Sequence, residues 1–306
     1  MHPNPFPGLT ARSLGLTDLD AAFAVYAADE VVDAGTLAIE KDDIEGDWAR
    51  PSFDLAHDTI GVFEGQRLLG AAEVTRAGSR AEGAVAPSAR GRGIGSWLVG
   101  WTERRATEMG SALVGQSTPE ESAASRLLAG RGYRLGHTSW VLELPAGHSV
   151  LDRPLPEGYA IVTGDDPPRE RAAHDVIDTA FAQWPGRAPE PYEDWAATTV
   201  RRPGREPWQL RVAETASGQV VAACFTILDS QGCGFVHQLA VDQAHRGQGL
   251  ARAMLADGFA AAREHGATRS ELATDSRTGA LDLYLGVGMV VSQTWTYLVT
   301  DLPRGQ

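Results

Sequence analysis

A glycine-rich turn that occurs twice constrains this chain more than any other feature. In the later copy, an apolar run from Phe235 to Val241 meets Arg246-Gly-Gln-Gly249, and a helical pattern follows at once. Glycines at a strand-to-helix turn leave backbone N–H groups uncovered, beside the positive end of the helix dipole. The sequence therefore predicts a cradle for an anion, most naturally a diphosphate.

The earlier copy runs from Val85 to Gly95 and repeats the same pattern. Arg90 and Arg246 are 156 residues apart, and the same interval separates Gly132 from Gly288. Only two copies at so long an interval indicate duplicated domains rather than a solenoid. For a chain of 306 residues we expect two domains, at residues 1–148 and 149–306.

Each half shows the same order of predicted elements: strand, two helices, hairpin, strand, helix, strand, helix, strand. Long helices are expected directly after the two turns, at residues 93–109 and up to residue 265. Final strands are expected at 139–144 and 293–301. This order predicts an α+β fold of two tandem domains, each a mixed, mostly antiparallel sheet flanked by helices.

Composition narrows the range of partners and locations. The net charge of −13 argues against nucleic acid, because phosphate backbones need a basic surface. The chain has no apolar run of about 18–20 residues and does not begin like a signal peptide, which predicts a cytoplasmic protein with no membrane partner. The eight histidines show no metal-ligand spacing, so we expect no metal, and we expect a monomer or homodimer.

The pattern Arg-x-x-Gly-x-Gly/Ala, between a strand and a long helix, resembles the acetyl-CoA motif of the GNAT (GCN5-related) N-acetyltransferase superfamily. It occurs as Arg90…Gly95 and as Arg246…Ala251. The downstream segment Leu283 to Met289 resembles the family's Leu-Tyr…Gly-Phe/Met segment. The two copies are similar in layout to tandem GNAT proteins.

The resemblance implies acetyl transfer from acetyl-CoA to the amine of a small molecule, without a covalent enzyme intermediate. It also implies that the cofactor lies against the turns and the strand edges before them. The expected cofactor-binding residues are Val85, Arg90, Gly91, Arg92, Gly93, Ile94 and Gly95 in the first half, and Leu239, Ala240, Val241, Arg246, Gly247, Gln248, Gly249, Leu250, Ala251 and Ser276 in the second.

Tyr284 stands at the family's tyrosine position and is the expected acid that protonates the departing thiolate. The strand before the second turn has no carboxylate, so His237 is the candidate base, on one face with Leu239 and Val241 by alternation. Tyr284 as a packing residue and His237 as a structural or substrate-orienting residue remain open alternatives. In the first half, Leu128 takes the place of Tyr284.

The resemblance implies an acceptor site between the first two helices of a domain and its sheet. In the second half that region is a Pro- and Gly-rich segment, residues 181–195, with aromatic and acidic side chains. Its candidate binding residues are Trp184, Tyr192 and Trp195. Aromatic residues that anchor a loop on the core are an equally open interpretation. We thus expect a catalytic second domain and a first domain that is structural or binds CoA without turnover, although Glu82 and Tyr133 leave a catalytic first domain open.

A different class of function is a non-catalytic acyl-CoA-binding or sensing protein with both halves degenerate. The strand before the second turn has no carboxylate, which favours this binding protein, whereas the presence of Tyr284 favours the enzyme. A nicotinamide-nucleotide turn is excluded at Gly91 to Gly95, because the glycine spacing is wrong and no acidic residue ends a second parallel strand.

Overall fold

The computed structural model describes residues 6–150, 155–184 and 187–303, which form two compact units. The first unit runs to Thr138 and takes up the chain again from Thr294, and the second runs from Ser139 to Gln293. This division differs from the expected boundary after residue 148.

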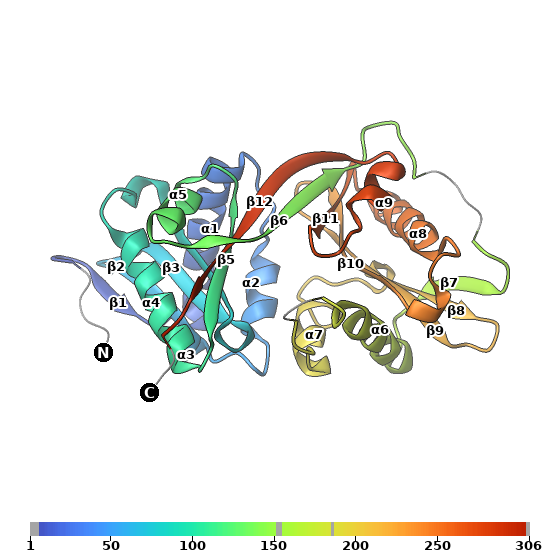
Figure 1. Ribbon diagram of the computed structural model, residues 1–306, viewed down its shortest axis with the longest axis horizontal. Helices are drawn as coiled ribbons and strands as arrows, with labels where there is room; N and C mark the ends of the chain where they lie inside the picture. Colours follow the sequence, from blue (N-terminus) through green and yellow to red (C-terminus); the bar gives the residue numbers. More distant parts are fainter. Residues whose placement is uncertain (1–5, 151–154, 185–186, 304–306) are drawn as a thin grey trace. The chain divides into compact units, whose positions relative to one another are not determined.

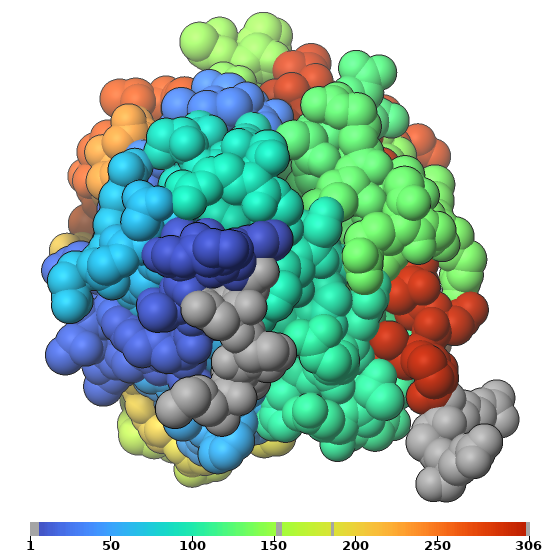
Figure 2. All heavy atoms as spheres, turned by 90° about the vertical axis from the view of Figure 1, so that its left-hand side faces the viewer, coloured from blue at the N-terminus to red at the C-terminus, as the bar shows by residue number. Residues whose placement is uncertain are grey.

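The difference arises because two long strands cross between the units. The strand β6 (Arg134–Glu143) pairs antiparallel with β11 (Arg269–Asp275) of the second unit. The last strand, β12 (Val290–Asp301), pairs antiparallel with β5 (Leu113–Pro119) of the first. Figure 2 shows the end of β12 in red against the green surface of the first unit. Each half of the sequence thus supplies a strand to the other half's sheet.

The first unit is a twisted sheet with helices on both faces (Figure 1). Strands β1 to β4 pair antiparallel in sequence order, and β4 pairs parallel with β5. The remaining strands of this unit are β1 (Thr10–Arg12), β2 (Thr59–Glu64), β3 (Arg67–Thr75) and β4 (Arg80–Val85). Its helices are α1 (Leu19–Ala34), α2 (Lys41–Trp48), α3 (Leu55–Asp58), α4 (Ile94–Glu108) and α5 (Ala123–Gly130).

The second unit repeats this arrangement. Strands β7 to β10 pair antiparallel in sequence order, and β10 pairs parallel with β11. Its further strands are β7 (Tyr159–Thr163), β8 (Leu210–Thr215), β9 (Val220–Leu228) and β10 (Cys233–Val241). Its helices are α6 (Pro167–Phe181), α7 (Tyr192–Thr198), α8 (Leu250–Glu264) and α9 (Leu281–Gly286).

The two faces of the second sheet have separate hydrophobic cores. Met254 of α8 packs with Cys224, Leu239 and other side chains from one face of β9 and β10. Trp195 of α7 packs with Phe225 and other side chains from the opposite face. Cys224 therefore lies on the face of the sheet that α8 covers, and the next residue, Phe225, lies on the face that α6 and α7 cover.

The expected α+β order of elements is confirmed, and most differences are at element ends. Helix α1 continues to Ala34 because Gly35, with a φ of 78°, terminates it in a left-handed conformation. Strand β6 begins at Arg134, five positions before its expected start, since β12 extends the sheet beside it. None of the helices in the described ranges combines the length and apolar character that a bilayer-crossing helix needs.

Candidate active site

The two predicted cradles have the same backbone conformation. Arg90 and Arg246 are extended, with φ/ψ of −62°/158° and −71°/163°. Gly93 and Gly249 then adopt left-handed conformations, with φ/ψ of 82°/−3° and 92°/0°, and each begins a 15-residue helix. A residue with a Cβ is strained at such a φ, which is why glycine stands at both positions.

In the described chain, both helices, α4 and α8, begin without a side-chain cap, although the Phe6 ring lies against Gly93 at the start of α4. A Cβ at Gly91, Gly247 or Gly249 would meet nothing within 4 Å, so the backbone there faces open space. Uncapped N–H groups at a helix N-terminus bind phosphate oxygens well.

The two cradles differ in charge. Two carboxylates of α1 hold Arg90, with Nη2–Oδ1 of 2.6 Å to Asp29 and Nη1–Oδ1 of 2.7 Å to Asp33. By contrast, Arg246 donates from Nε to the Val241 carbonyl and from Nη1 to Gln183 Oε1, both at 3.0 Å. Within the described residues Arg246 has no carboxylate partner, so the second cradle keeps more positive charge for a diphosphate.

Tyr159, at the start of β7, supports the second cradle. Its hydroxyl lies 2.8 Å from His245 Nδ1 and donates to Gln248 Oε1 at 3.1 Å. These contacts fix the turn on both sides of Arg246. Neither Tyr159 nor Gln183 is recognisable from the sequence, because no local pattern connects either residue with a turn more than 60 residues away.

A β-bulge splays the second sheet just before its cradle. Strands β10 and β11 pair only from Cys233 to Val236, and the register of β10 against β9 shifts between Val236 and Gln238. Beyond the bulge, Leu239 to Val241 pair with β9 but not with β11. Their outer edge is therefore free to pair with an extended ligand.

The bulge also corrects the expected orientation of His237. Because it interrupts the alternation, His237 does not share a face with Leu239 and Val241, which pack in the α8 core. Its exposed ring instead lies edge-on to Phe225, with centroids 6.2 Å apart, toward the α6/α7 face. This places an imidazole at the splay, on the side opposite Tyr284.

Tyr284 lies on the α8 side of the same splay. Its side chain is 8% exposed and packs in the core with Met254 and Leu239. Burial, with a smaller contribution from the Cys224 thiol, raises the pKa of Tyr284 to about 12. Among the described residues its hydroxyl has no hydrogen-bond partner, so a protonated phenol is free to donate to a ligand.

The aromatic residues expected to bind substrate lie in different environments. Trp195 is 1% exposed, and its indole N–H donates to Gln238 Oε1 at 2.8 Å, next to the bulge. It therefore anchors α7 on the sheet and is not on an open wall. Tyr192 lies under the Arg171 guanidinium, 4.2 Å from ring centroid to Cζ, and Trp184 stacks on Phe181 at 4.3 Å.

Ser276 follows β11 in an exposed loop beside Arg277. The Arg277 guanidinium lies 5.7 Å from the Trp184 ring centroid. Trp184 and this loop are therefore neighbours on one side of the second unit. In the described residues, no three His, Cys, Asp or Glu side chains gather as a metal site.

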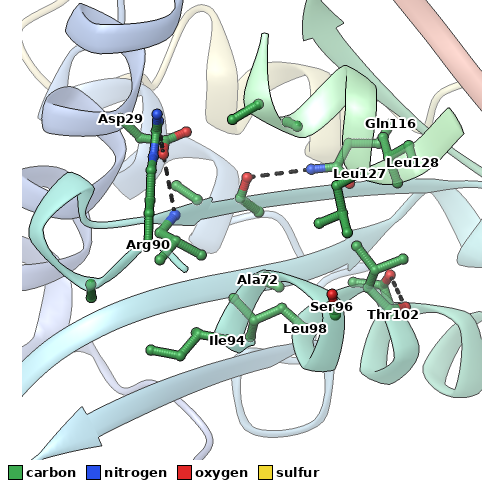
Figure 3. Close-up of a pocket in the computed structure, with 18 of the residues that line it drawn as sticks. Asp29, Ala72, Arg90, Ile94, Ser96, Leu98, Thr102, Gln116, Leu127 and Leu128 are labelled. Atoms are coloured by element: carbon green, nitrogen blue, oxygen red, sulfur yellow. Dashed lines mark hydrogen bonds and ion pairs between the residues drawn. The ribbon is translucent and has the colours of Figure 1, made fainter. Parts of the chain in front are cut away.

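The first unit contains a cavity of about 270 Å³ beside its cradle. Strands β4 and β5 pair at one position, Arg80 with Gly115, and then separate. Gln116 bridges the gap by donating from Nε2 to the Gly83 carbonyl at 3.3 Å. Figure 3 shows the cavity between Arg90 at one end and Leu128 and Thr102 at the other.

Fold and site together define a duplicated α+β protein with two glycine-rich turns at uncapped helix N-termini, each next to a splayed pair of parallel strands. The sequence model of the acetyltransferase (GNAT) family matches residues 170–289. A mycothiol acetyltransferase from Thermobispora bispora is 28% identical over 247 residues, which cover 77% of this chain and 80% of the relative. One from Salinispora arenicola is 30% identical over 222 residues, which cover 69% and 70%.

A solved structure extends the likeness to both units. The GCN5-related N-acetyltransferase from Sphaerobacter thermophilus has a TM-score of 0.74 and 26% identity, covering 99% of this chain and 98% of that one. The chain belongs to the GNAT acetyltransferase family, as a tandem member similar to the mycothiol acetyltransferases. The resemblance inferred from the two turns is thereby confirmed.

Proposed function

We propose that the protein transfers the acetyl group of acetyl-CoA to the amine of a small molecule, and that the reaction takes place in the second unit. The family match at residues 170–289 lies within that unit and supports this choice. The observation that carries the proposal is the position of Tyr284, a buried, protonated phenol beside the splayed end of β10.

The second cradle would hold the diphosphate of acetyl-CoA on the amides of residues 246–251. The pantetheine arm would then pair with Leu239 to Val241, whose outer edge the bulge leaves free. In that position a β10 amide can donate to the thioester oxygen and stabilise the negative charge of the tetrahedral transition state. Arg246, which has no carboxylate partner in the part of the chain that the structure describes, adds to the attraction.

His237 would accept the proton of the attacking ammonium, directly or through a water molecule. Its ring is exposed on the α6/α7 face, and imidazole is the side chain that most often acts as a general base. The amine nitrogen then bonds to the acetyl carbon and the carbon–sulfur bond breaks. Tyr284, on the opposite side, donates its proton to the departing sulfur, and through solvent the phenolate regains the extra proton that the new amide nitrogen releases.

The acceptor would enter over the α6/α7 face, near Trp184 and Tyr192. The aromatic rings there are suited to an amine with an apolar body. The relatives' name, mycothiol acetyltransferase, supports a small-molecule acceptor. Trp195 would act indirectly, through its hydrogen bond to Gln238.

The first unit would hold CoA through residues 85–95 without turnover. Leu128 takes the place of Tyr284, and Arg90 is neutralised by Asp29 and Asp33. The alternative function, a non-catalytic acyl-CoA-binding or sensing protein, is favoured by this first unit alone, because it offers a cavity and a cradle with no acid at the sulfur position.

Release of free thiol from acetyl-CoA, measured across a panel of amines, amino acids, polyamines and aminoglycosides, tests the proposal. Calorimetric titration with CoA is run in parallel. Amine-dependent thiol release supports the enzyme, and CoA binding without release for any amine supports the binding protein.

A further inference from the structure

The cavity of the first unit lies where the second unit is filled by side chains. Register pairs Gly83 with Ala72 in the first unit, and Leu239 with Cys224 at the corresponding position of the second. Leu128, at the far end of the cavity, corresponds to Tyr284. At all three positions the first unit has the smaller side chain, namely Gly for Leu, Ala for Cys and Leu for Tyr.

The packing of the second unit at this place is dense. Tyr284 and Cys224 are both buried in the α8 core, and the thiol contributes to the environment of the phenol. A Cβ at Gly258 would lie 3.0 Å from Cys224 Sγ, so even one added methyl group lacks room there. The first unit has Thr102 at that position, on the wall of its cavity.

The inner end of the cavity is mostly apolar. Beyond Gly83, apolar side chains of β3, α4 and α5 form its walls, namely Ala72, Leu98, Val99, Ala124, Leu127 and Leu128. The two polar side chains there, Thr102 and Gln116, donate to the backbone carbonyls of Val99 and Gly83. The charged groups on its lining, Asp29, Asp33, Glu82 and Arg90, come from α1, the strand β4 and the cradle. A ligand with a charged end and an apolar end matches this distribution.

We propose that the first unit binds a CoA thioester whose acyl chain is longer than acetyl, with the chain in the inner end of this cavity. The inference depends on the proposed cradle of the first unit and adds the chemical class of its ligand. Without a phenol at the sulfur position, such a thioester would be held and not consumed.

The affinity gained for each buried methylene group sets the size of the expected difference between acyl-CoA ligands. Removing one CH₂ from water increases affinity about fourfold. We therefore expect affinity to rise by about that factor with each carbon from acetyl- to butyryl-CoA, and to level off or fall once the apolar end is filled.

The test isolates the first unit in the full-length chain. Ser96 and Arg252 occupy equivalent positions in the first turns of α4 and α8. Arg252→Glu places a carboxylate beside the second cradle and so repels the diphosphate of CoA from it. Ser96→Glu does the same at the first cradle. Because a carboxylate is compatible with a helix N-terminus, both variants should fold.

Calorimetry of Arg252→Glu with CoA and with acetyl-, propionyl-, butyryl- and hexanoyl-CoA gives the chain-length profile. Binding that strengthens beyond acetyl, and is lost in the Ser96→Glu, Arg252→Glu double variant, supports the proposal. Equal or weaker binding of the longer chains overturns it and leaves the cradle intact. Absence of any CoA binding overturns the cradle of the first unit itself.

Two further variants fill the cavity as the second unit does. Leu128→Tyr and Gly83→Leu, each in the Arg252→Glu background, should remove the preference for longer chains and keep free CoA within about twofold. A Cβ at Gly83 approaches no atom closer than 3.4 Å, so that variant remains informative if Leu128→Tyr does not fold. An unchanged chain-length profile in a folded Gly83→Leu protein contradicts the assigned location.

Discussion

Replacing Tyr284 by phenylalanine separates a catalytic phenol from a packing tyrosine. In the described structure the hydroxyl makes no hydrogen bond, so its removal leaves no partner unsatisfied. The ring keeps its place in the α8 core. We therefore expect the free energy of unfolding to change by less than about 1 kcal/mol.

Turnover, unlike stability, should fall strongly. A positioned general acid contributes about 10²–10⁴-fold to rate. The variant should lose that factor in kcat, equivalent to about 2.7–5.4 kcal/mol of transition-state stabilisation. The KM for acetyl-CoA should change little, because the phenol acts at the sulfur and not at the diphosphate. Free-thiol release by stopped-time assay, with saturating amine, measures both constants.

Tyr133→Phe is the matched control. Tyr133 is also a buried phenol, but its hydroxyl donates to Glu103 Oε1 at 3.2 Å, and burial raises its pKa well above the ordinary value. Losing a hydrogen bond to a carboxylate should cost about 1.5–3 kcal/mol of stability, with no change in turnover. If Tyr284→Phe behaves like this control, losing stability and keeping its rate, then Tyr284 is a packing residue and the assignment fails.

Three further outcomes are expected. Tyr159→Phe removes the bonds to His245 and Gln248, so the KM for acetyl-CoA should rise severalfold at unchanged kcat in steady-state assays; an unchanged KM contradicts its support of the cradle. Gly249→Ala should weaken CoA binding in calorimetry, whereas Gly266→Ala, at a similarly left-handed φ outside the cradle, should cost similar stability, about 1–2 kcal/mol, without weakening binding. Burial raises the pKa of Glu73 from 4.5 to about 8, so the native state retains a proton that the unfolded chain releases; stability should fall as pH rises through that window, and a Glu73→Gln protein whose denaturation shows the same fall refutes this source.

The cradles were predictable from sequence because their chemistry is local. Gly93 and Gly249 are required by a left-handed φ at the first turn of a helix, and a single 156-residue interval relates them. The order of elements followed from periodicity for the same reason. Tyr284 was found because the segment from Leu283 to Met289 resembles the family's Leu-Tyr…Gly-Phe/Met segment, but its burial and raised pKa depend on the packing of β9 and α8.

The remaining features depend on contacts between distant segments. The exchange of β6 and β12 could not be read from the order of elements, because either strand would complete either sheet by pattern alone. The face of His237 was wrongly predicted, since a bulge of one residue reverses alternation without leaving a sequence signal. The cavity of the first unit has a faint signal in the sequence, because Gly83 occupies the repeat position of Leu239. That difference acquires meaning only with the strand register, which pairs Gly83 with Ala72 and Leu239 with Cys224.

The most direct test of the central claim is a crystal structure of the protein with acetyl-CoA. The account predicts the diphosphate on the amides of residues 246–251, the pantetheine arm along Leu239 to Val241, and the Tyr284 hydroxyl within about 3.5 Å of the thioester sulfur. Saturating acetyl-CoA that leaves the second cradle empty, or a thioester turned away from Tyr284, would contradict it.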